Sequence, residues 1–347
     1  MCNMNGYAGR HRAAPKLLDL LKQQEGFGGG HFSGIATIHE GKIHSAKVVG
    51  DVAKLIAETD ALNLPGNVGI AHSRSPGDPY QSWSHPFFSS DGHVAYCANG
   101  TMGIFEDKVD RNHWYQFLKD QGFTFGSAVP GKVGKYNAYS DGNCVHFSDV
   151  MCGLVAYYHI NNGKSLKDAM ATMITESPSA IAALAISDKE PKSLAAVRLD
   201  APLMWGYKHD DGMYISTSAI PLHSFDIPWI QPVPMCCAMQ MSEDGVQFSP
   251  IDAWFTQKLL EPNNPWPQAT HIMDQLISDN AAHSVGELAG KIKPLWTKDT
   301  IDQSTMVAYE YIRSLWLDKQ IELIHSTAKG SGENLLAPTI RVKKIQS

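Results

Sequence analysis

The amino-acid sequence predicts an α+β protein in which sheets and helices form separate layers. Strand-like and helix-like segments occur in runs along residues 2–250, whereas repeated βαβ units would alternate strictly. Beyond residue 250 helix-like segments and several prolines dominate, which predicts a helical C-terminal extension. We therefore expect two units, residues 2–250 and 251–347.

The order of the predicted elements follows from apolar spacing and turn residues. Short apolar runs bounded by turn residues predict strands at 3–9, 34–49 (a hairpin), 67–73, 87–97 (a second hairpin), 180–187, 193–198, 203–207 and 212–217. Helical spacing of apolar residues, with Asp51 as an N-cap, predicts helices at 14–24, 52–62, 148–161, 164–176, 251–260, 270–278, 285–292 and 301–326. The last 20 residues are predicted to form a tail.

Composition excludes several classes of function. A net charge of -6 argues against nucleic-acid binding, which usually needs a basic surface. No apolar run approaches the roughly 18 residues of a membrane span, and no signal segment is apparent. The 6 cysteines form no CxxC pair, so we expect reduced thiols and a cytoplasmic protein. The 15 histidines lack zinc spacing, so we expect no metal, and no cofactor motif is present either.

The chain starts with Met1-Cys2. Initiator methionine is commonly removed before a small side chain, and its removal would give Cys2 both a thiol and a free α-amine. Because a thiol (pKa ~8.5) and an α-amine (~7.7–8.0) exchange a proton near neutral pH, the amine can act as general base for the sulfur. By itself a Met-Cys start is a weak signal, and the alternative is a cysteine without a chemical role.

Further residues could complete a site for acyl transfer. Asn99-Gly100, at a predicted strand end, offers a side-chain NH₂ and an unhindered backbone N–H to a developing oxyanion. Arg74 follows a predicted buried strand, where it could bind a carboxylate through two hydrogen bonds. Asp141, in a Tyr-Ser-Asp-Gly segment, could pair with an ammonium group. The alternatives are an Asn-Gly turn, a surface arginine and an aspartate in a turn.

Together these residues resemble the class II glutamine amidotransferases, whose N-terminal-nucleophile (Ntn) hydrolase domain begins at a catalytic cysteine. The resemblance spans roughly residues 2–220. It rests on four motifs in the family's order: Cys2-Asn-Met-Asn-Gly6-Tyr-Ala-Gly9, Gly69-Ile-Ala-His72-Ser73-Arg74, Ser84-His85-Pro86-Phe87 and Ala98-Asn99-Gly100.

The resemblance implies a fold and a set of roles. The fold would be a four-layer αββα sandwich with two antiparallel sheets. Cys2 would be the nucleophile, and Asn99 and Gly100 would form the oxyanion hole. Arg74 would bind the α-carboxylate of glutamine and Asp141 its α-ammonium. The reaction would release ammonia, and then glutamate after water attacks a γ-glutamyl thioester.

Two histidines complete the predicted substrate-binding residues. His85 belongs to the Ser-His-Pro-Phe motif, and its alternative role is structural hydrogen bonding. His31, followed closely by Gly34, resembles stand-alone members of the superfamily, including the amidohydrolase of ergothioneine biosynthesis. In addition, residues 75–78 lack the aromatic gate that usually follows the family's arginine.

The partner and the substrate stay open. The segment near Trp254 is similar to the one that joins the two halves of glucosamine-6-phosphate synthase, but only about 90 residues follow it, too few for that enzyme's isomerase domains. We therefore expect a separate sugar-isomerase-type subunit to receive the ammonia. The alternatives are a stand-alone γ-glutamyl or linear amide hydrolase and a catalytically silent glutamine sensor. An apolar helical stripe in residues 301–324 could form a homo-oligomer interface, although helix packing is the simpler interpretation.

Overall fold

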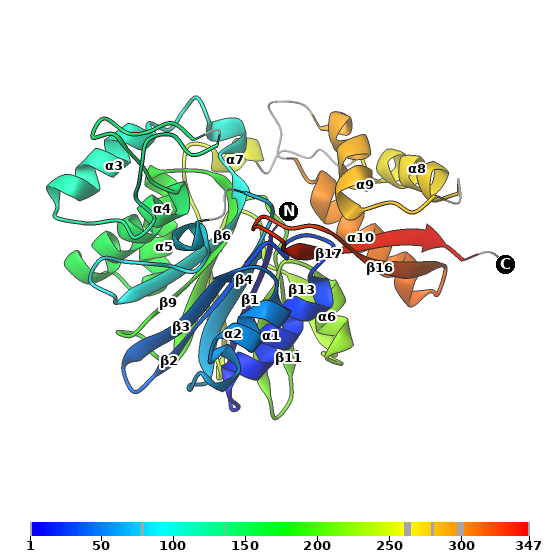
Figure 1. Cartoon of the computed structure of the whole chain (residues 1–347), viewed down its shortest axis with the longest axis horizontal. Helices are drawn as coiled ribbons and strands as arrows, with labels where there is room; N and C mark the ends of the chain where they lie inside the picture. Colours follow the sequence, from blue (N-terminus) through cyan, green and yellow to red (C-terminus); the bar gives the residue numbers. More distant parts are fainter. Residues whose placement is uncertain are drawn as a thin grey trace.

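Two antiparallel sheets form the centre of the protein (Figure 1). The computed structural model describes residues 2–77, 80–134, 136–259, 265–278, 281–296 and 302–345. The first sheet has seven strands in the order β13-β11-β12-β1-β4-β2-β3. In chain order these strands are β1 (Asn3–Gly9), β2 (Phe32–His39), β3 (Lys42–Val49), β4 (Val68–Arg74), β11 (Met204–Lys208), β12 (Gly212–Ser216) and β13 (Trp229–Pro232).

The second sheet has six strands in the order β15-β14-β10-β9-β6-β5. In chain order they are β5 (Phe87–Phe88), β6 (Val94–Thr101), β9 (Ala180–Ser187), β10 (Ser193–Arg198), β14 (Cys237–Ser242) and β15 (Gly245–Pro250). Two-residue strands β7 (Val129–Pro130) and β8 (Asn143–Cys144) pair separately. The predicted α+β class with antiparallel sheets is confirmed.

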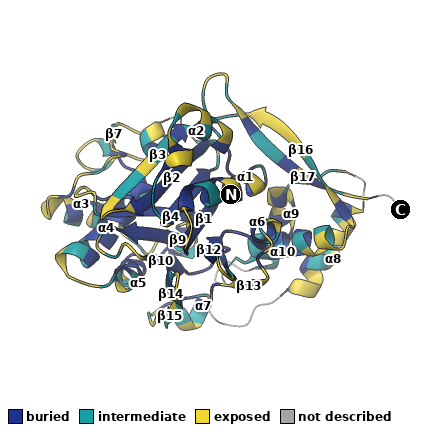
Figure 2. Ribbon diagram, turned by 90° about the horizontal axis from the view of Figure 1, so that it is seen from below, coloured by how far each residue is buried: buried dark blue, intermediate teal, exposed yellow. Residues whose placement is uncertain are grey.

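Helices cover the sheets on the sides that do not face each other. One apolar cluster joins the sheets and includes Met4 and Ile70 from the first and Leu184 and Leu194 from the second. A second cluster lies between the first sheet and α1 (Ala13–Gln24), α2 (Val52–Glu58) and α6 (Ala219–Ser224). A third lies between the second sheet and α3 (Arg111–Asp120), α4 (Phe147–Ala156) and α5 (Leu166–Glu176). The central strands β1, β4, β9 and β10 are consequently dark blue, or buried, in Figure 2, whereas β3, β13 and β15 are partly exposed.

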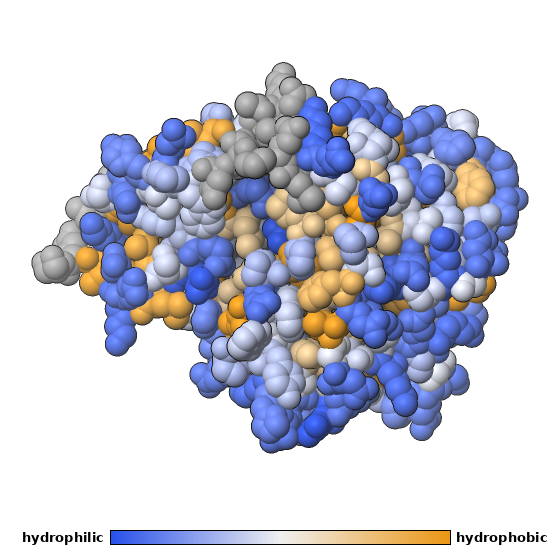
Figure 3. All heavy atoms as spheres, turned by 180° about the vertical axis from the view of Figure 1, so that it is seen from behind, coloured by the Kyte–Doolittle hydropathy of each residue, from blue (hydrophilic) through white to orange (hydrophobic). Residues whose placement is uncertain are grey.

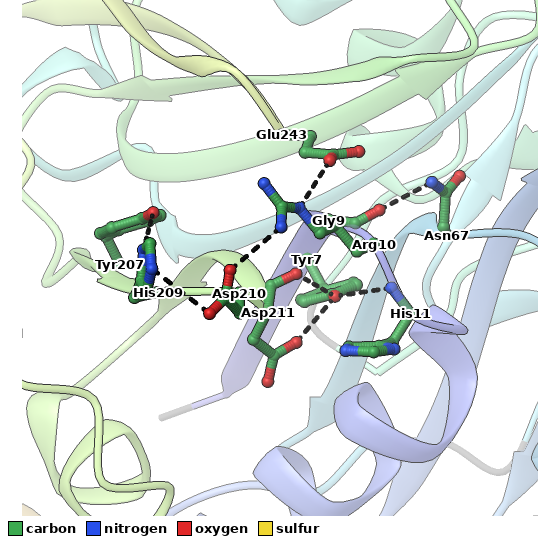
Figure 4. A network of polar contacts seen from close by, with 10 residues as sticks. All are labelled: Tyr7, Gly9, Arg10, His11, Asn67, Tyr207, His209, Asp210, Asp211 and Glu243. Atoms are coloured by element: carbon green, nitrogen blue, oxygen red, sulfur yellow. Dashed lines mark hydrogen bonds and ion pairs between the residues drawn. The ribbon is translucent and has the colours of Figure 1, made fainter.

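Polar contacts join the sheets at the end of β1 that lies far from Cys2 (Figure 4). The Arg10 guanidinium bonds to Glu243, in the turn between β14 and β15, and to Asp210, in the turn between β11 and β12. Beside them the Tyr7 hydroxyl donates to Asp211 at 2.9 Å. The Arg10 pairs are exposed to solvent, so they contribute little to stability.

The C-terminal region has its own apolar cluster and is not wholly helical. Its helices are α7 (Thr256–Leu259), α8 (Trp266–Ile277), α9 (Val285–Ile292) and α10 (Ser304–Leu317), and its hairpin is β16 (Ile321–Lys329) with β17 (Leu336–Lys344). The predicted helix over 301–326 is therefore wrong beyond residue 317, and residue 301 lies outside the described residues. The predicted tail is also wrong, because β17 occupies it. The helix ends because Lys319 adopts a left-handed φ of 56°, a common way for helices to stop.

The other predicted elements agree with the structure to within a few residues. The exceptions are α3, α6, β7, β8 and β13 to β15, which have no counterpart in the sequence-based prediction, and the helix predicted at 251–260, which is four residues long. Leu260 lies outside the described residues. Figure 3 shows the rear face, where apolar residues gather toward the middle and hydrophilic ones surround them. No described helix is long and apolar enough to cross a membrane.

Candidate active site

Cys2 lies where the start of β1 meets the end of β4. The two strands are antiparallel and pair Asn3 with Ser73, so the residue before β1 adjoins the residues that follow β4. The Ser75 N–H donates to the Cys2 sulfur at 3.5 Å, and the Ser75 hydroxyl lies 3.7 Å from it. Cys2 is half-buried, and it is the one cysteine of the chain that is not buried.

The Cys2 thiol has an unusual pKa. Burial by itself raises that pKa, but the His72 imidazole, the Ser75 N–H and the positive terminus outweigh it and lower the pKa to about 6. In the other five cysteines burial raises the pKa of the thiol. Cys2 is thus the cysteine that is a thiolate at neutral pH, the form that acts as a nucleophile.

Asn99, near the end of β6, touches Cys2 and keeps a free donor. Its Oδ1 accepts a hydrogen bond from the Cys2 N–H at 3.3 Å. Its Nδ2 is buried and has no hydrogen-bond partner in the described part of the chain. An unpaired buried donor costs about 1–3 kcal/mol, so such a group in a native fold needs an explanation. A bound anionic oxygen would provide one.

Gly100 follows Asn99 in a conformation that requires glycine. Its φ is 133°, and a Cβ there would lie 2.2 Å from the Ala180 carbonyl oxygen. His72 supports the same strand end from the other sheet, because its Nε2–H donates to the Ala98 carbonyl at 3.1 Å. The predicted oxyanion pair is therefore next to Cys2 and is held by both sheets.

Arg74, the last residue of β4, is a buried cation without a carboxylate partner in the described structure. It is 8% exposed, and its guanidinium packs 4.9 Å from the Phe32 ring centroid and 6.0 Å from that of Trp83. Its one hydrogen bond within the described residues, to the Trp83 carbonyl, is long at 3.5 Å. Burying a charge is costly unless it is paired, so this arrangement favours an anionic ligand.

His85 lies behind this site in a buried group of histidines. Its ring centroid is 4.1 Å from that of His72 and 5.4 Å from that of His146. Both of its ring nitrogens are buried and have no partner among the described residues. Burial and the neighbouring cations keep the pKa of His85 and of His146 well below the usual range, so both are neutral. The Ser-His-Pro-Phe motif indicated His85, whereas His146 had no sequence signal.

His31 lies at the rim of the site and contacts the C-terminal hairpin. Its N–H donates to the Arg74 carbonyl at 3.1 Å, and its Nδ1 lies 3.0 Å from the Ser331 hydroxyl oxygen. Burial and then the positive terminus lower the pKa of His31, so the ring is neutral at neutral pH. Ser331 was not among the sequence-based predictions, because nothing in its local sequence indicates a contact 300 residues away.

Asp141 is not brought to this group. Its carboxylate accepts from the Tyr115 hydroxyl at 2.6 Å, from Lys119 Nζ at 3.0 Å and from the Asn143 N–H at 3.0 Å. These bonds hold the pKa of Asp141 well below its usual range. Within the described residues no contact joins Asp141 to Cys2. Asp141 instead lies in a turn, which was the alternative interpretation of the sequence.

The carboxyl group of Glu25, another acidic residue near the strand ends, is also hydrogen-bonded within the protein. Burial raises the pKa of the Glu25 carboxyl to about 7. That carboxyl accepts from the Ser73 hydroxyl at 2.7 Å, from the Ser33 hydroxyl at 3.2 Å and from the Val52 N–H at 3.1 Å. Glu25 therefore ties β4 to β2 and α2. Within the described residues, no group of three or more His, Cys, Asp or Glu side chains is arranged to hold a metal ion.

Comparison with known proteins identifies proteins of similar sequence. No family model matches the chain. Glutamine–fructose-6-phosphate aminotransferase (isomerizing) of Clostridium acetobutylicum is 29% identical over 252 residues, which is 72% of this chain and 36% of that protein. The Agrobacterium fabrum protein of the same name is 28% identical over 272 residues, 78% of this chain and 39% of that protein. The matched part thus spans little more than a third of these relatives.

A solved structure shares the fold. Glutamine phosphoribosylpyrophosphate amidotransferase from B. subtilis aligns with a TM-score of 0.59 at 14% identity, covering 84% of this chain and 63% of that one. The chain is therefore similar in sequence to the glutamine–fructose-6-phosphate aminotransferases and shares the fold of glutamine phosphoribosylpyrophosphate amidotransferase.

Proposed function

We propose that this protein hydrolyses glutamine, with Cys2 as nucleophile. The observation that carries the proposal is the grouping, around a reactive thiol, of an Asn99 NH₂ that has no partner among the described residues and a buried Arg74 guanidinium that has no carboxylate partner among them. An acyl-transfer site for an amino-acid amide needs a nucleophile, an oxyanion donor and a carboxylate anchor. The relatives' names, which include glutamine, agree with this chemistry.

The proposed reaction proceeds in two steps. The Cys2 thiolate attacks the amide carbon of the side chain, and the negative charge moves to the oxygen, which Asn99 Nδ2 and the Gly100 N–H stabilise. The C–N bond then breaks, the nitrogen takes a proton and leaves as ammonia, and a γ-glutamyl thioester forms. Water attacks the thioester and releases glutamate and the thiolate. After removal of Met1, which lies outside the described residues, the α-amine of Cys2 would shuttle the protons.

The roles of Arg74 as carboxylate anchor and of Asp141 as ammonium partner remain predictions, and the first has more support than the second. Arg74 fits a carboxylate because its guanidinium is buried and has no carboxylate partner among the described residues. Asp141 has no structural support as the ammonium partner, because Tyr115 and Lys119 occupy its carboxylate. We expect Asp141→Asn to change kcat/KM for glutamine less than threefold. A loss of tenfold or more would restore Asp141 to the site.

The relatives also suggest where the ammonia goes. Glutamine–fructose-6-phosphate aminotransferases are named for a sugar phosphate acceptor. We propose that a separate sugar-isomerase-type subunit receives the ammonia made here. We further propose that the layers formed by residues 2–250 constitute the four-layer αββα sandwich, because helices pack outside both sheets. An assembly with that subunit should raise the glutaminase rate when the sugar phosphate is present, and an unchanged rate would argue against this partner.

One observation favours a second substrate class. Among the described residues no free carboxylate contacts Cys2, so this part of the chain shows no partner for the α-ammonium of glutamine. A linear amide that carries a carboxylate but no ammonium group would fit Arg74 equally well. Comparing glutamine with 4-carbamoylbutanoate, its analogue without the amino group, separates the two. A higher kcat/KM for the analogue would identify a linear amide hydrolase.

The test of the proposal is a glutaminase assay on the purified chain. We expect equimolar ammonia and glutamate from the wild type, and a loss of at least about 10³-fold in Cys2→Ala, as for other covalent catalysts that lose their nucleophile. Cys97→Ala is the matched control, because that thiol is buried and burial raises its pKa. Glutamine binding without turnover, unchanged in Cys2→Ala, would identify a silent sensor instead.

A further inference from the structure

The C-terminal hairpin extends back over the first sheet. β17 runs along the segment that follows α1, where the Ile340 N–H donates to the Gly26 carbonyl at 2.9 Å. A Cβ on Gly30 would lie 2.7 Å from Pro338, so the two backbones approach closely there. Figure 2 shows the hairpin, largely exposed, reaching from the C-terminal helices toward α2 and β3. Its tip therefore ends on the N-terminal part of the chain.

Ser331, in the loop at the hairpin tip, makes two bonds there. Its hydroxyl oxygen accepts from the Gly77 N–H at 3.1 Å and lies 3.0 Å from His31 Nδ1. Because the His31 ring is neutral, its Nδ1 can accept the single hydroxyl proton while a lone pair of the oxygen accepts the Gly77 proton. The hydroxyl thus joins two segments that flank the site.

The loop that Ser331 holds touches the reacting groups. This loop, residues 75–77, follows Arg74 directly, and the Ser75 N–H donates to the Cys2 sulfur. A Cβ on Gly77 would lie 2.9 Å from Arg74 Nη2, so this end of the loop lies against the guanidinium. A shift of the loop at its Gly77 end would therefore alter the carboxylate anchor.

We propose that Ser331 is a positioning residue of the site: by joining His31 to Gly77 it holds the 75–77 loop against Arg74 and so sets the affinity for the substrate carboxylate. The inference rests on the proposed function, because it needs a substrate with a carboxylate. It assigns the hairpin a part in completing the substrate pocket of the N-terminal part. Residues 75–77 lack an aromatic gate. The Ser331 hydroxyl, which lies outside the two sheets, bonds to this loop at Gly77.

The test compares Ser331→Ala with Ser326→Ala in the full chain. Ser326 lies on the same hairpin, where its hydroxyl bonds only to that of Thr339 on the exposed side. We expect Ser331→Ala to raise KM for glutamine about tenfold with kcat within twofold, because two modest hydrogen bonds are lost. Ser326→Ala should match the wild type, and Ser331→Thr, which retains the hydroxyl, should recover most of the affinity.

A readout independent of activity accompanies the kinetics. Amide hydrogen exchange at Gly77 should become faster in Ser331→Ala and stay at the wild-type rate in Ser326→Ala. Alkylation of Cys2 by iodoacetamide, which carries no carboxylate, should be equal in all variants. An unchanged KM together with unchanged exchange at Gly77 would overturn the inference. An equal loss of affinity for glutamine and of iodoacetamide reactivity would also overturn it. Failure of the proposed function would differ, since the wild type itself would then not hydrolyse glutamine.

Discussion

Arg74 and Arg198 are both the last residue of a central strand, β4 in the first sheet and β10 in the second, and both are buried. Arg198 is 3% exposed and donates to the carbonyls of Ala201 and Val233 and to the Gln303 side chain. Arg74 is 8% exposed and has one long bond to a carbonyl. Within the described residues, the fold thus gives one buried guanidinium three acceptors and the other a single long hydrogen bond.

This difference separates a structural charge from a functional one. Arg198 ties the strand end to the segment before α10 through Gln303, which in turn donates to the Asp200 carbonyl. Burial lowers the pKa of Arg198 to about 10, a cost that its hydrogen bonds offset. Arg74 has no such compensation in the described structure, and the reactive Cys2 lies beside the loop that follows it. We infer that a ligand completes the Arg74 site.

The largest expected effect concerns the oxyanion donor beside this unpaired cation. Asn99→Ala removes the proposed side-chain donor of the oxyanion hole, so kcat for glutamine should fall about 10²- to 10³-fold. Iodoacetamide alkylation of Cys2 should change little, since that reaction develops no oxyanion. A kcat within fivefold of the wild type would show that the unpaired amide has another purpose.

The comparison of Arg74 with Arg198 gives the next largest effect. Arg74→Met should lower kcat/KM for glutamine about 30- to 100-fold, because charge-assisted bonds to a carboxylate are lost. Arg198→Met should leave kcat/KM of the folded protein within threefold. Steady-state kinetics on the two variants measures the contrast directly, and equal losses would mean that burial rather than ligand binding explains Arg74.

Stability should change in the opposite sense for the same two variants. Arg74→Met removes a buried unpaired charge and keeps a side chain that packs against aromatic rings, so the free energy of unfolding should rise by about 1 kcal/mol. Arg198→Met leaves buried carbonyls without donors and should lower it by about 3 kcal/mol. Urea denaturation checks both, and a destabilised Arg74→Met would contradict the comparison.

The smallest effect is a shift in pH dependence. Because the pKa of the Cys2 thiol lies below its ordinary value, the thiolate predominates above about pH 6. Alkylation by iodoacetamide should therefore rise between pH 5 and 7 and level off above pH 7, whereas an ordinary thiol would continue to gain reactivity through about pH 8.5. Peptide mass spectrometry assigns the rate to Cys2. A midpoint near pH 8.5 would show that the neighbouring groups do not lower the pKa of the Cys2 thiol.

Local pattern predicted the parts of the site that lie at strand ends. Arg74 and Asn99 each follow or end a strand that its own apolar residues define, so both could be placed from the sequence. Asp141 could not be assigned correctly by the same means, because its partner Tyr115 belongs to a helix that the sequence did not reveal. Ser331 depends on a contact 254 residues away. The apolar spacing of Ile321 and Ile324 is compatible with a helix as well as a strand, and only pairing with β17 decides between them.

The most direct test of the central claim is labelling with 6-diazo-5-oxonorleucine, a glutamine analogue that alkylates the nucleophile from within the substrate pocket. Intact mass and N-terminal peptide mass should show one adduct, located on a Cys2 that begins the chain, and glutamine should slow its formation. The Arg74→Met variant should need a much higher reagent concentration. A chain without Met1 that reacts with iodoacetamide at Cys2 but forms no adduct with the analogue would contradict the account, because the thiol would then lack a pocket for glutamine.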